Sequence, residues 1–164
     1  NKSKATLVGK PWLEIKYCKE IDREPFYATF KKEGKEFTIV NFHAITKAKQ
    51  PETEVKYFKY LPAEYPKLNL IFCGDFNLPE THSVFNPLKS QGYNPLLKGQ
   101  KTTLREKPVD GDFLASEYDN IFYHKDKLKI LQKGVVHFYK KFNNFDDAKA
   151  VSDHIPVFFI LGLL

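Results

Sequence analysis

The stretch Leu-Asn-Leu-Ile-Phe-Cys-Gly-Asp-Phe-Asn, residues 68–77, decides how the fold of this chain is interpreted. Its first part, Leu68–Cys73, is an apolar run without alternation, which is typical of a strand covered on both faces. Asp75 and Asn77 follow directly, so a carboxylate and an amide leave the core on the same side of the chain. Polar side chains at the end of a rigid strand are well placed for chemistry. The alternative interpretation is a plain Asx turn that closes the strand.

The remaining sequence switches between strand-like and helix-like periodicity, which predicts a mixed α and β fold. The two β-rich segments around Gly34 predict a hairpin with glycine at its turn. Proline and acidic residues at the start of residues 51–61, with Val55, Phe58 and Leu61 on one face, predict a surface helix. We therefore expect strands at residues 25–30, 37–43, 118–123, 127–138 and 155–163, helices at 51–61 and 80–90, the latter broken at Pro87, and a long loop at 98–116.

The composition indicates a single globular unit with a basic surface. The chain has 164 residues, of which 42% are hydrophobic, enough to form one sizeable core. Its net charge of +6 favours an anionic partner such as nucleic acid, an acidic membrane surface or a phosphorylated small molecule. The lysines are scattered, however, which is equally typical of a solvated surface. No run approaches the roughly 18 apolar residues that a membrane-spanning helix needs, so we expect no membrane span.

The two cysteines, Cys18 and Cys73, lie far apart and lack metal-ligand spacing. Cys73 stands in an apolar run, where a free buried thiol is expected. This cysteine usage leaves the compartment open, with a secreted or periplasmic location among the alternatives. Because the sequence starts at Asn1 and contains no methionine, we expect it to be a processed or cut part of a longer protein.

Acids and histidines stand at the ends of three further predicted strands. Asp153 and His154 are adjacent, so on extended chain they point to opposite sides and need different partners. Asp153 suits a metal ion and His154 a proton or a phosphate oxygen; the alternative is a helix-capping aspartate beside a surface histidine. Asp119 lies among apolar neighbours, where a carboxylate needs a donor, and a histidine is the natural one. His43 ends a strand and offers a second imidazole, or is an ordinary hydrogen-bonded histidine.

Five such segments occur together and in a fixed order. They are Arg-Glu-Pro-Phe at 23–26, a strand ending in His43, Gly-Asp-Phe-Asn at 74–77, Tyr-Asp-Asn-Ile at 118–121 and Ser-Asp-His-Ile-Pro-Val at 152–157. Their joint occurrence by chance is remote. The order resembles the endonuclease/exonuclease/phosphatase superfamily over residues 21–159, and the first and fourth segments look most like its deoxyribonuclease I branch.

The resemblance implies an α+β fold of two β-sheets packed face to face and flanked by helices. Residues 1–164 would be the C-terminal part of that domain and supply about one half of it, with the N-terminal half missing. That half would carry a metal-binding glutamate; Glu14 and Glu20 lie too close to Arg23 to be this ligand and are expected to be solvent-facing strand residues. We therefore expect an uncovered apolar face that binds the missing N-terminal half or a second copy of the chain.

The resemblance also implies a divalent-metal-dependent endonuclease that hydrolyses DNA phosphodiester bonds with Mg²⁺, or with Mn²⁺ or Ca²⁺. Asp75 would orient the attacking water, Asn77 would hold a phosphate oxygen, and Asp119 would pair with His154. The implied sets are His43, Asp75, Asn77, Asp119 and His154 for catalysis, Asp153 and Asp75 for the metal, and Arg23, Asn77, Thr102 and Thr103 for the substrate.

Two rival functions stay open at this point. A phosphodiesterase or phosphatase of the same superfamily could act on a phospholipid or a phosphoinositide, and a non-catalytic module could hold nucleic acid or a protein. Individual assignments have alternatives too: Thr102 and Thr103 fit ordinary loop threonines, and Arg23 could tie one strand to its neighbour instead of contacting nucleic acid.

Overall fold

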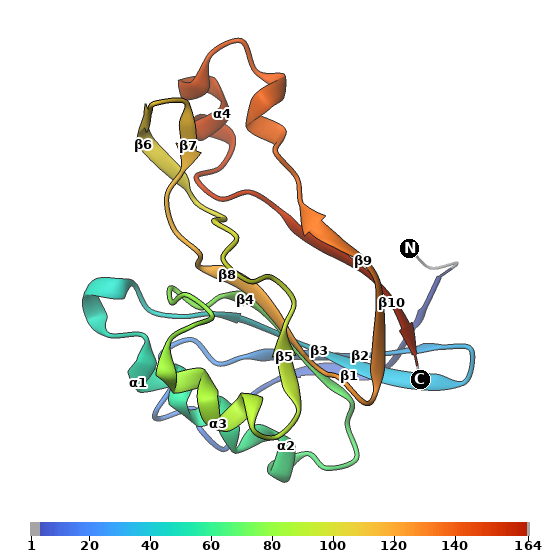
Figure 1. Ribbon diagram of the computed structural model, residues 1–164. Helices are drawn as coiled ribbons and strands as arrows, with labels where there is room; N and C mark the ends of the chain where they lie inside the picture. Colours follow the sequence, from blue (N-terminus) through green and yellow to red (C-terminus); the bar gives the residue numbers. More distant parts are fainter. Residues whose placement is uncertain (1–3, 164) are drawn as a thin grey trace.

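The largest element is a six-stranded mixed sheet with the strand order β1-β2-β3-β4-β8-β5 (Figure 1). The structure is a computed structural model that describes residues 4–163. The strands of this sheet are β1 (Thr6–Leu13), β2 (Phe26–Lys32), β3 (Lys35–His43), β4 (Leu70–Asp75), β8 (Asp119–His124) and β5 (Tyr93–Pro95). β2 and β3 form the predicted hairpin, and β4 lies between parallel β3 and antiparallel β8. The central position of β4 explains its unalternating apolar sequence, because both of its faces are covered.

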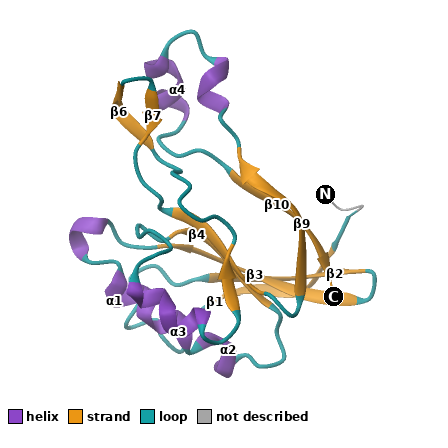
Figure 2. Ribbon diagram, in the orientation of Figure 1, coloured by secondary structure: helices purple, strands orange, loops and turns teal. Residues whose placement is uncertain are grey.

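Short helices cover one face of this sheet (Figure 2). They are α1 (Glu52–Val55), η2 (Lys56–Lys59), α2 (Leu61–Glu64), η3 (Ser83–Phe85) and α3 (Asn86–Lys89). The short helix η1 (Lys47–Lys49), in the loop after β3, has no buried residue. Val55, Phe58 and Leu61 are buried as predicted, although the expected helix at residues 51–61 is divided into short α and 3₁₀ pieces. Pro87 lies in the first turn of α3, where a missing N–H costs little, so it starts a helix and does not break one.

The opposite face of the sheet is partly covered by an antiparallel pair, β9 (Leu128–Val135) and β10 (Val157–Leu163). Ile71 and Ile121 pack there against a cluster that includes Phe159. Cys73 belongs to this cluster as a free, half-buried thiol whose pKa is raised by burial to about 11. The predicted α+β class is confirmed. That the chain supplies about one half of a larger two-sheet domain stays a prediction.

A small lobe rises from the sheet edge at which β4 ends and β8 begins, and consists of residues 104–114 and 138–151 (Figure 1). It contains β6 (Leu104–Val109), β7 (Asp112–Leu114), η4 (Phe138–Lys141) and α4 (Phe145–Val151), around a core that includes Tyr139 and Ala148. The prediction of a long loop at residues 98–116 was wrong in part, because β6 and β7 form a hairpin within it. Asp110 and Gly111 at its tip both have positive φ, at 49° and 79°, as a tight hairpin turn requires.

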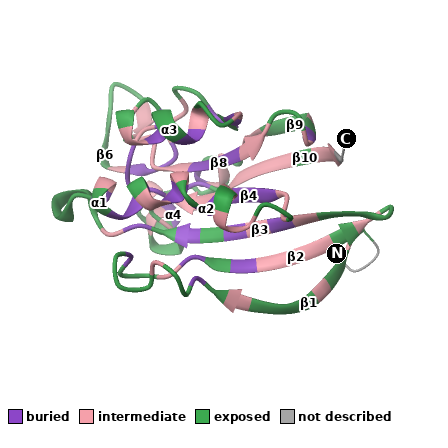
Figure 3. Cartoon of the chain, turned by 90° about the horizontal axis from the view of Figure 1, so that it is seen from below, coloured by how far each residue is buried: buried purple, intermediate pink, exposed green. Residues whose placement is uncertain are grey.

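The two edge strands of the main sheet differ in burial: β1 is mostly exposed (Figure 3), whereas Tyr93 and Pro95 of β5 are buried. Glu14, just after β1, is an exception that contradicts its predicted solvent-facing position. It is only 2% exposed and accepts hydrogen bonds from the hydroxyls of Tyr27 at 2.7 Å and Tyr65 at 3.0 Å. Burial and this carboxylate raise the pKa of both tyrosines. Glu20 is exposed, but in a turn and not in a strand.

None of the helices within residues 4–163 has the length and apolar character needed to cross a membrane.

Candidate active site

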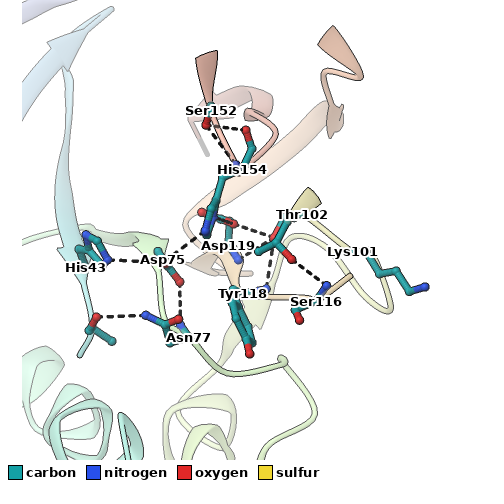
Figure 4. A network of polar contacts seen from close by, with 12 residues as sticks. His43, Asp75, Asn77, Lys101, Thr102, Ser116, Tyr118, Asp119, Ser152 and His154 are labelled. Carbon is teal, nitrogen blue, oxygen red and sulfur yellow. Dashed lines mark hydrogen bonds and ion pairs between the residues drawn. The ribbon is translucent and has the colours of Figure 1, made fainter. Parts of the chain in front are cut away.

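Three predicted site residues form one row across the sheet, at the end where β3 and β4 finish and β8 begins. His43 of β3 is paired in register with Asp75 of β4, and Asp75 with Asp119 of β8. Figure 4 shows the three side chains at this edge, with His154 reaching down to them from the segment before β10. Strand pairing therefore brings together three chemically active groups that are far apart in sequence, and the segment before β10 adds His154 as the fourth.

Gly74 allows β3 and β4 to come together next to this row. Its φ is +141°, and a Cβ built on it would lie 1.8 Å from the carbonyl oxygen of Phe42. No side chain fits in that space, so only glycine permits this approach of the two backbones. The next residue, Asp75, accepts a backbone hydrogen bond from Ala44 at 2.8 Å. The glycine of the sequence motif thus fixes the distance between the strands that carry His43 and Asp75.

Asp119 and His154 form a close polar pair in the site. The Nδ1 atom of His154 lies 2.7 Å from Oδ2 of Asp119, and its Nε2 atom lies 3.9 Å from Oδ2 of Asp75. With Asp119 ionised, Nδ1–H is the donor, and this bond sets the tautomer and the orientation of the ring. The pKa of His154 is raised mainly by the hydrogen bond with Asp119, with burial acting in the opposite direction. The pairing predicted from the sequence is present.

Thr102 holds the other side of the Asp119 carboxylate. Its hydroxyl donates to Oδ2 of Asp119 at 2.7 Å and accepts the backbone N–H of Asp119 at 2.9 Å. Its carbonyl oxygen accepts the N–H of Ile155 at 2.7 Å, which ties it to the His154 segment. Thr102 is fully buried, so the predicted contact of Thr102 with a substrate is replaced by this internal role.

Asp75 lies between the two imidazoles. Its Oδ2 is 3.6 Å from Nε2 of His43, and its Oδ1 accepts the backbone N–H of Asn77 at 2.8 Å. The pKa of Asp75 is raised, chiefly by burial and further by the charge of Asp119, while the Asn77 bond and the histidines oppose this shift. The Asn77 side chain donates one amide hydrogen to the carbonyl of Ala44 at 3.1 Å. Its second amide hydrogen is left for another acceptor.

These groups line a cleft of about 370 Å³. Its lining residues are His43, Thr46, Asp75, Asn77, Thr103, Leu104, Tyr118, Asp153 and His154. Asp153 and His154 were expected to point to opposite sides and to have different partners. Their partners do differ, because only His154 contacts Asp119, but both residues line this one cleft. Thr103 accepts a hydrogen bond from the N–H of Ser116 and borders the cleft. Arg23 is exposed in the loop before β2 and is not among the lining residues.

The oxygen donors of the cleft suit a hard divalent cation. Asp75 and Asp153 both line it, and Mg²⁺ is commonly bound through one or two carboxylates together with water and substrate phosphate oxygens. Within residues 4–163, no three side chains of His, Cys, Asp or Glu are grouped closely enough to hold a metal ion by themselves. The residues present therefore fit an open Mg²⁺ site and not a closed protein cage.

Glu54 supports the His43 side of the cleft and was not predicted. This carboxylate is 2% exposed and accepts the backbone N–H groups of Asp22 at 2.6 Å and Ile45 at 3.0 Å. It thereby ties the loop that follows His43 to the loop before β2. A signal for it does exist in the sequence, because Glu54 precedes Phe58 by four residues and so falls on the buried face of the predicted helix.

No family model matches the sequence, and a search of curated proteins found no match. Solved structures do match: the human Nocturnin catalytic domain with bound sulfate has a TM-score of 0.70 at 17% identity, over 99% of this chain and 62% of that one. An endonuclease/exonuclease/phosphatase family protein from Bacteroides thetaiotaomicron has a TM-score of 0.61 at 20% identity, over 96% of this chain and 65% of that one.

The chain has the endonuclease/exonuclease/phosphatase fold. The structure of D. rerio TDP2 complexed with a single-strand DNA product agrees, with a TM-score of 0.69 at 14% identity over 98% of this chain and 70% of that one. The resemblance read from the five sequence segments is therefore confirmed at the level of the fold. This chain spans less than two thirds of the Nocturnin and Bacteroides chains, so activity and partners are matters for proposal.

Proposed function

We propose that this endonuclease/exonuclease/phosphatase fold is the catalytic part of a divalent-metal-dependent endonuclease that hydrolyses DNA phosphodiester bonds. The observation that carries the proposal is the convergence of two histidines on Asp75. His43 lies 3.6 Å and His154 3.9 Å from the same carboxylate oxygen, and Asp119 fixes His154 at 2.7 Å. A carboxylate between two imidazoles can serve a reaction in which water attacks a phosphate and a leaving oxygen is protonated.

Each side chain has a role that its contacts support. Asp75 accepts a proton from, or orients, the attacking water, and its raised pKa brings its basicity closer to neutral pH. His154, whose pKa is raised chiefly by its hydrogen bond with Asp119, donates Nε2–H to a phosphate or leaving-group oxygen. The second amide hydrogen of Asn77 stabilises charge that grows on a phosphate oxygen. His43, with a side chain that is 60% exposed, meets the substrate from the solvent side.

Asp75 and Asp153 would hold Mg²⁺, Mn²⁺ or Ca²⁺ at this cleft. When bound, such a cation neutralises charge that develops on the phosphoryl oxygens. Asp153 suits this role because its side chain is exposed at the cleft and has no hydrogen bond or ion pair with other described residues. A DNA substrate is supported by the net charge of +6.

Plasmid nicking in Mg²⁺ tests the proposal, with hydrolysis of bis-p-nitrophenyl phosphate as a small-substrate assay. We expect Asp75→Asn and His154→Ala to abolish both activities. Asp126→Asn is the matched control, because Asp126 is exposed in the turn after the far end of β8 and undergoes the same chemical change. Unchanged nicking in the Asp75 and His154 variants would contradict the assigned roles, and release of phosphate from monoesters without nicking would favour the phosphatase alternative.

We also propose that the second layer of the fold is completed by an N-terminal half of the same fold or by a second copy of the chain. Leu131 and Ile160 on β9 and β10 are 60% and 50% exposed. Between the main sheet and β10 lies a cavity of about 470 Å³ whose lining includes Cys73, Ile121 and Phe159. Size-exclusion chromatography with a hydrophobic dye tests this: a monomer that binds no dye would contradict the proposal.

A further inference from the structure

A second cleft lies in the lobe, outside the candidate active site. It has a volume of about 520 Å³, within the range of ligand-binding sites, and is lined by Phe113, Tyr139, Lys140, Phe142, Asn143 and Phe145. Four of these six residues are aromatic. None of them lines the catalytic cleft, so this second cleft needs its own explanation.

The aromatic rings of the lobe cleft form a rigid back wall and an accessible rim. Phe113 packs against Tyr139 with ring centroids 5.4 Å apart and against Phe145 at 5.1 Å. The Tyr139 ring is buried, and its hydroxyl is 3.2 Å from Nδ1 of His137. Phe142 is different, since it is 38% exposed. A fixed wall with one exposed ring is suited to stacking a planar aromatic group.

Basic side chains lie next to the lobe cleft, although the lobe as a whole, residues 104–114 and 138–151, has no net charge, with five basic and five acidic residues. Lys140 lines the cleft itself. Asp112, which precedes Phe113, is paired with both Lys101 at 2.7 Å and Arg105 at 3.0 Å, so this group has a net positive charge. Of the lobe's other acids, Glu106 is paired with Lys149, while Asp110 lies at the hairpin tip and Asp146 and Asp147 in the first turn of α4.

The same cations connect the lobe cleft to the catalytic cleft. Lys101 precedes Thr102, whose hydroxyl contacts Asp119, and Figure 4 shows the Lys101 side chain pointing away from that contact. Lys101 then reaches Asp112, and the charge of Asp112 acts on Tyr139 in the lobe cleft, whose pKa is raised mainly by burial and also by this carboxylate. Chain neighbours and the Lys101–Asp112 ion pair therefore connect the Asp119–His154 pair to Phe113, which follows Asp112 and lines the aromatic cleft.

We propose that the lobe cleft binds an unpaired nucleobase of the strand whose phosphate lies in the catalytic cleft. The base stacks on Phe142, the Asn143 amide can hydrogen-bond its edge, and Lys101, Arg105 and Lys140 lie near the connecting phosphates. In a duplex the bases are stacked and paired, and so they cannot enter such a cleft without being extruded. The inference rests on the proposed function and deepens it by naming the substrate class as nucleic acid with an unpaired segment.

Fluorescence anisotropy with a labelled single-stranded oligonucleotide in EDTA tests the inference, because binding is then measured without metal-dependent cleavage. We expect Phe142→Ala to weaken binding by about 5-fold to 100-fold, as loss of one stacked base does. Phe142→Trp should retain binding, while Phe142→Leu, which keeps an apolar side chain, should not. Tyr60→Ala is the matched control, because Tyr60 is a similarly exposed ring, at 45%, on the helix-covered side.

Two further measurements separate this inference from the proposed function. With an oligonucleotide that lacks its bases, Phe142→Ala should bind as the wild-type chain does, and its hydrolysis of bis-p-nitrophenyl phosphate should be unchanged. If Phe142→Ala loses oligonucleotide binding while the wild-type chain hydrolyses no phosphodiester, the lobe cleft is still assigned as a nucleobase site and the endonuclease proposal is rejected. Equal binding by the wild-type chain and Phe142→Ala, or equal weakening with the abasic oligonucleotide, would overturn the inference.

Discussion

The two histidines of the candidate site are held in different ways. On the β10 side, His154 is fixed by Asp119, which is itself fixed by the buried hydroxyl of Thr102, with both distances at 2.7 Å. On the β3 side, His43 contacts Asp75 at 3.6 Å and its side chain is 60% exposed. The support from Glu54 on that side reaches the backbone after His43 and not its imidazole ring.

This difference indicates that the His154 side and the His43 side of the site have different roles. A group that must hold a proton in one tautomer benefits from a fixed partner, because orientation and charge are then set before the substrate arrives. A group that only meets a phosphate oxygen can remain adjustable. We therefore expect changes on the His154 side to affect the chemical step most, and changes on the His43 side to affect substrate binding.

Replacing Asp119 should have the largest effect on this comparison. Asp119→Asn removes the charge that raises the pKa of His154 and lets the ring adopt the wrong tautomer. We expect kcat for bis-p-nitrophenyl phosphate to fall by about 10²-fold to 10⁴-fold, the range for loss of general acid–base catalysis, with little change in KM. Steady-state kinetics measures both quantities. A change confined to KM would show that Asp119 acts on binding.

Replacing His43 should have a smaller effect of a different kind. The loss of one hydrogen bond to a charged phosphate oxygen corresponds to about 10-fold to 100-fold in kcat/KM. Because His43 is exposed and loosely held, the thermal stability of His43→Ala should match that of the wild-type chain. A kcat loss as large as that of Asp119→Asn would remove the distinction between the two histidines.

Thr102 offers a graded test of the fixed side. Thr102→Val keeps the shape but removes the hydroxyl, which leaves Oδ2 of Asp119 without its second donor; we expect kcat to fall by about 5-fold to 100-fold and stability to fall as well. Thr102→Ser keeps the hydroxyl and should restore most of kcat even where stability stays reduced. Equal losses in kcat for Val and Ser would mean that Thr102 acts only through packing.

The pH dependence of the rate should shift in a definite direction. The raised pKa of His154 means that the protonated form persists to higher pH, so its contribution to activity and to stability is present at low pH and is lost as pH rises through that pKa. Asp119→Asn removes the cause of the shift, so the alkaline limb of kcat should move to lower pH. A limb that does not move would point to another titrating group.

The smallest expected effect concerns stability. The pKa of Asp75 is raised in the folded chain, so its ionised form disfavours folding at neutral pH, and this cost disappears as pH falls. Asp75→Asn, which is inactive under the proposed mechanism, should therefore be slightly more stable than the wild-type chain at neutral pH and lose that advantage in acid. Urea denaturation at two pH values measures the difference, and a less stable variant at neutral pH would contradict it.

The sequence predicted the candidate site better than its surroundings. His43, Asp75, Asp119 and His154 each stand beside a strand end with a recognisable pattern. Strand pairing brings the first three together, and the contact with Asp119 adds His154. The burial of Glu14 could not be predicted locally, because its donors, Tyr27 and Tyr65, come from separate parts of the chain.

Other misses have local causes. The Asp110-Gly111 pair is a hairpin signal, but the charged residues on both sides of it lack the alternating apolar pattern of strands, so a loop was predicted where β6 and β7 form. The role of Thr102 depends on a contact with Asp119, which lies seventeen residues further along the chain, and sequence gives no indication of which hydroxyl faces which carboxylate.

The distance between His43 and Asp75 depends on the absence of a single carbon atom, the Cβ that Gly74 lacks. A methyl group at this position would clash with the Phe42 carbonyl and push the two strands apart. The next pair of residues along β3 and β4 is His43 and Asp75. Folding and activity would then be damaged by the same substitution. Sequence variation in this chain should accordingly be tolerated in the lobe more readily than at this one position in β4.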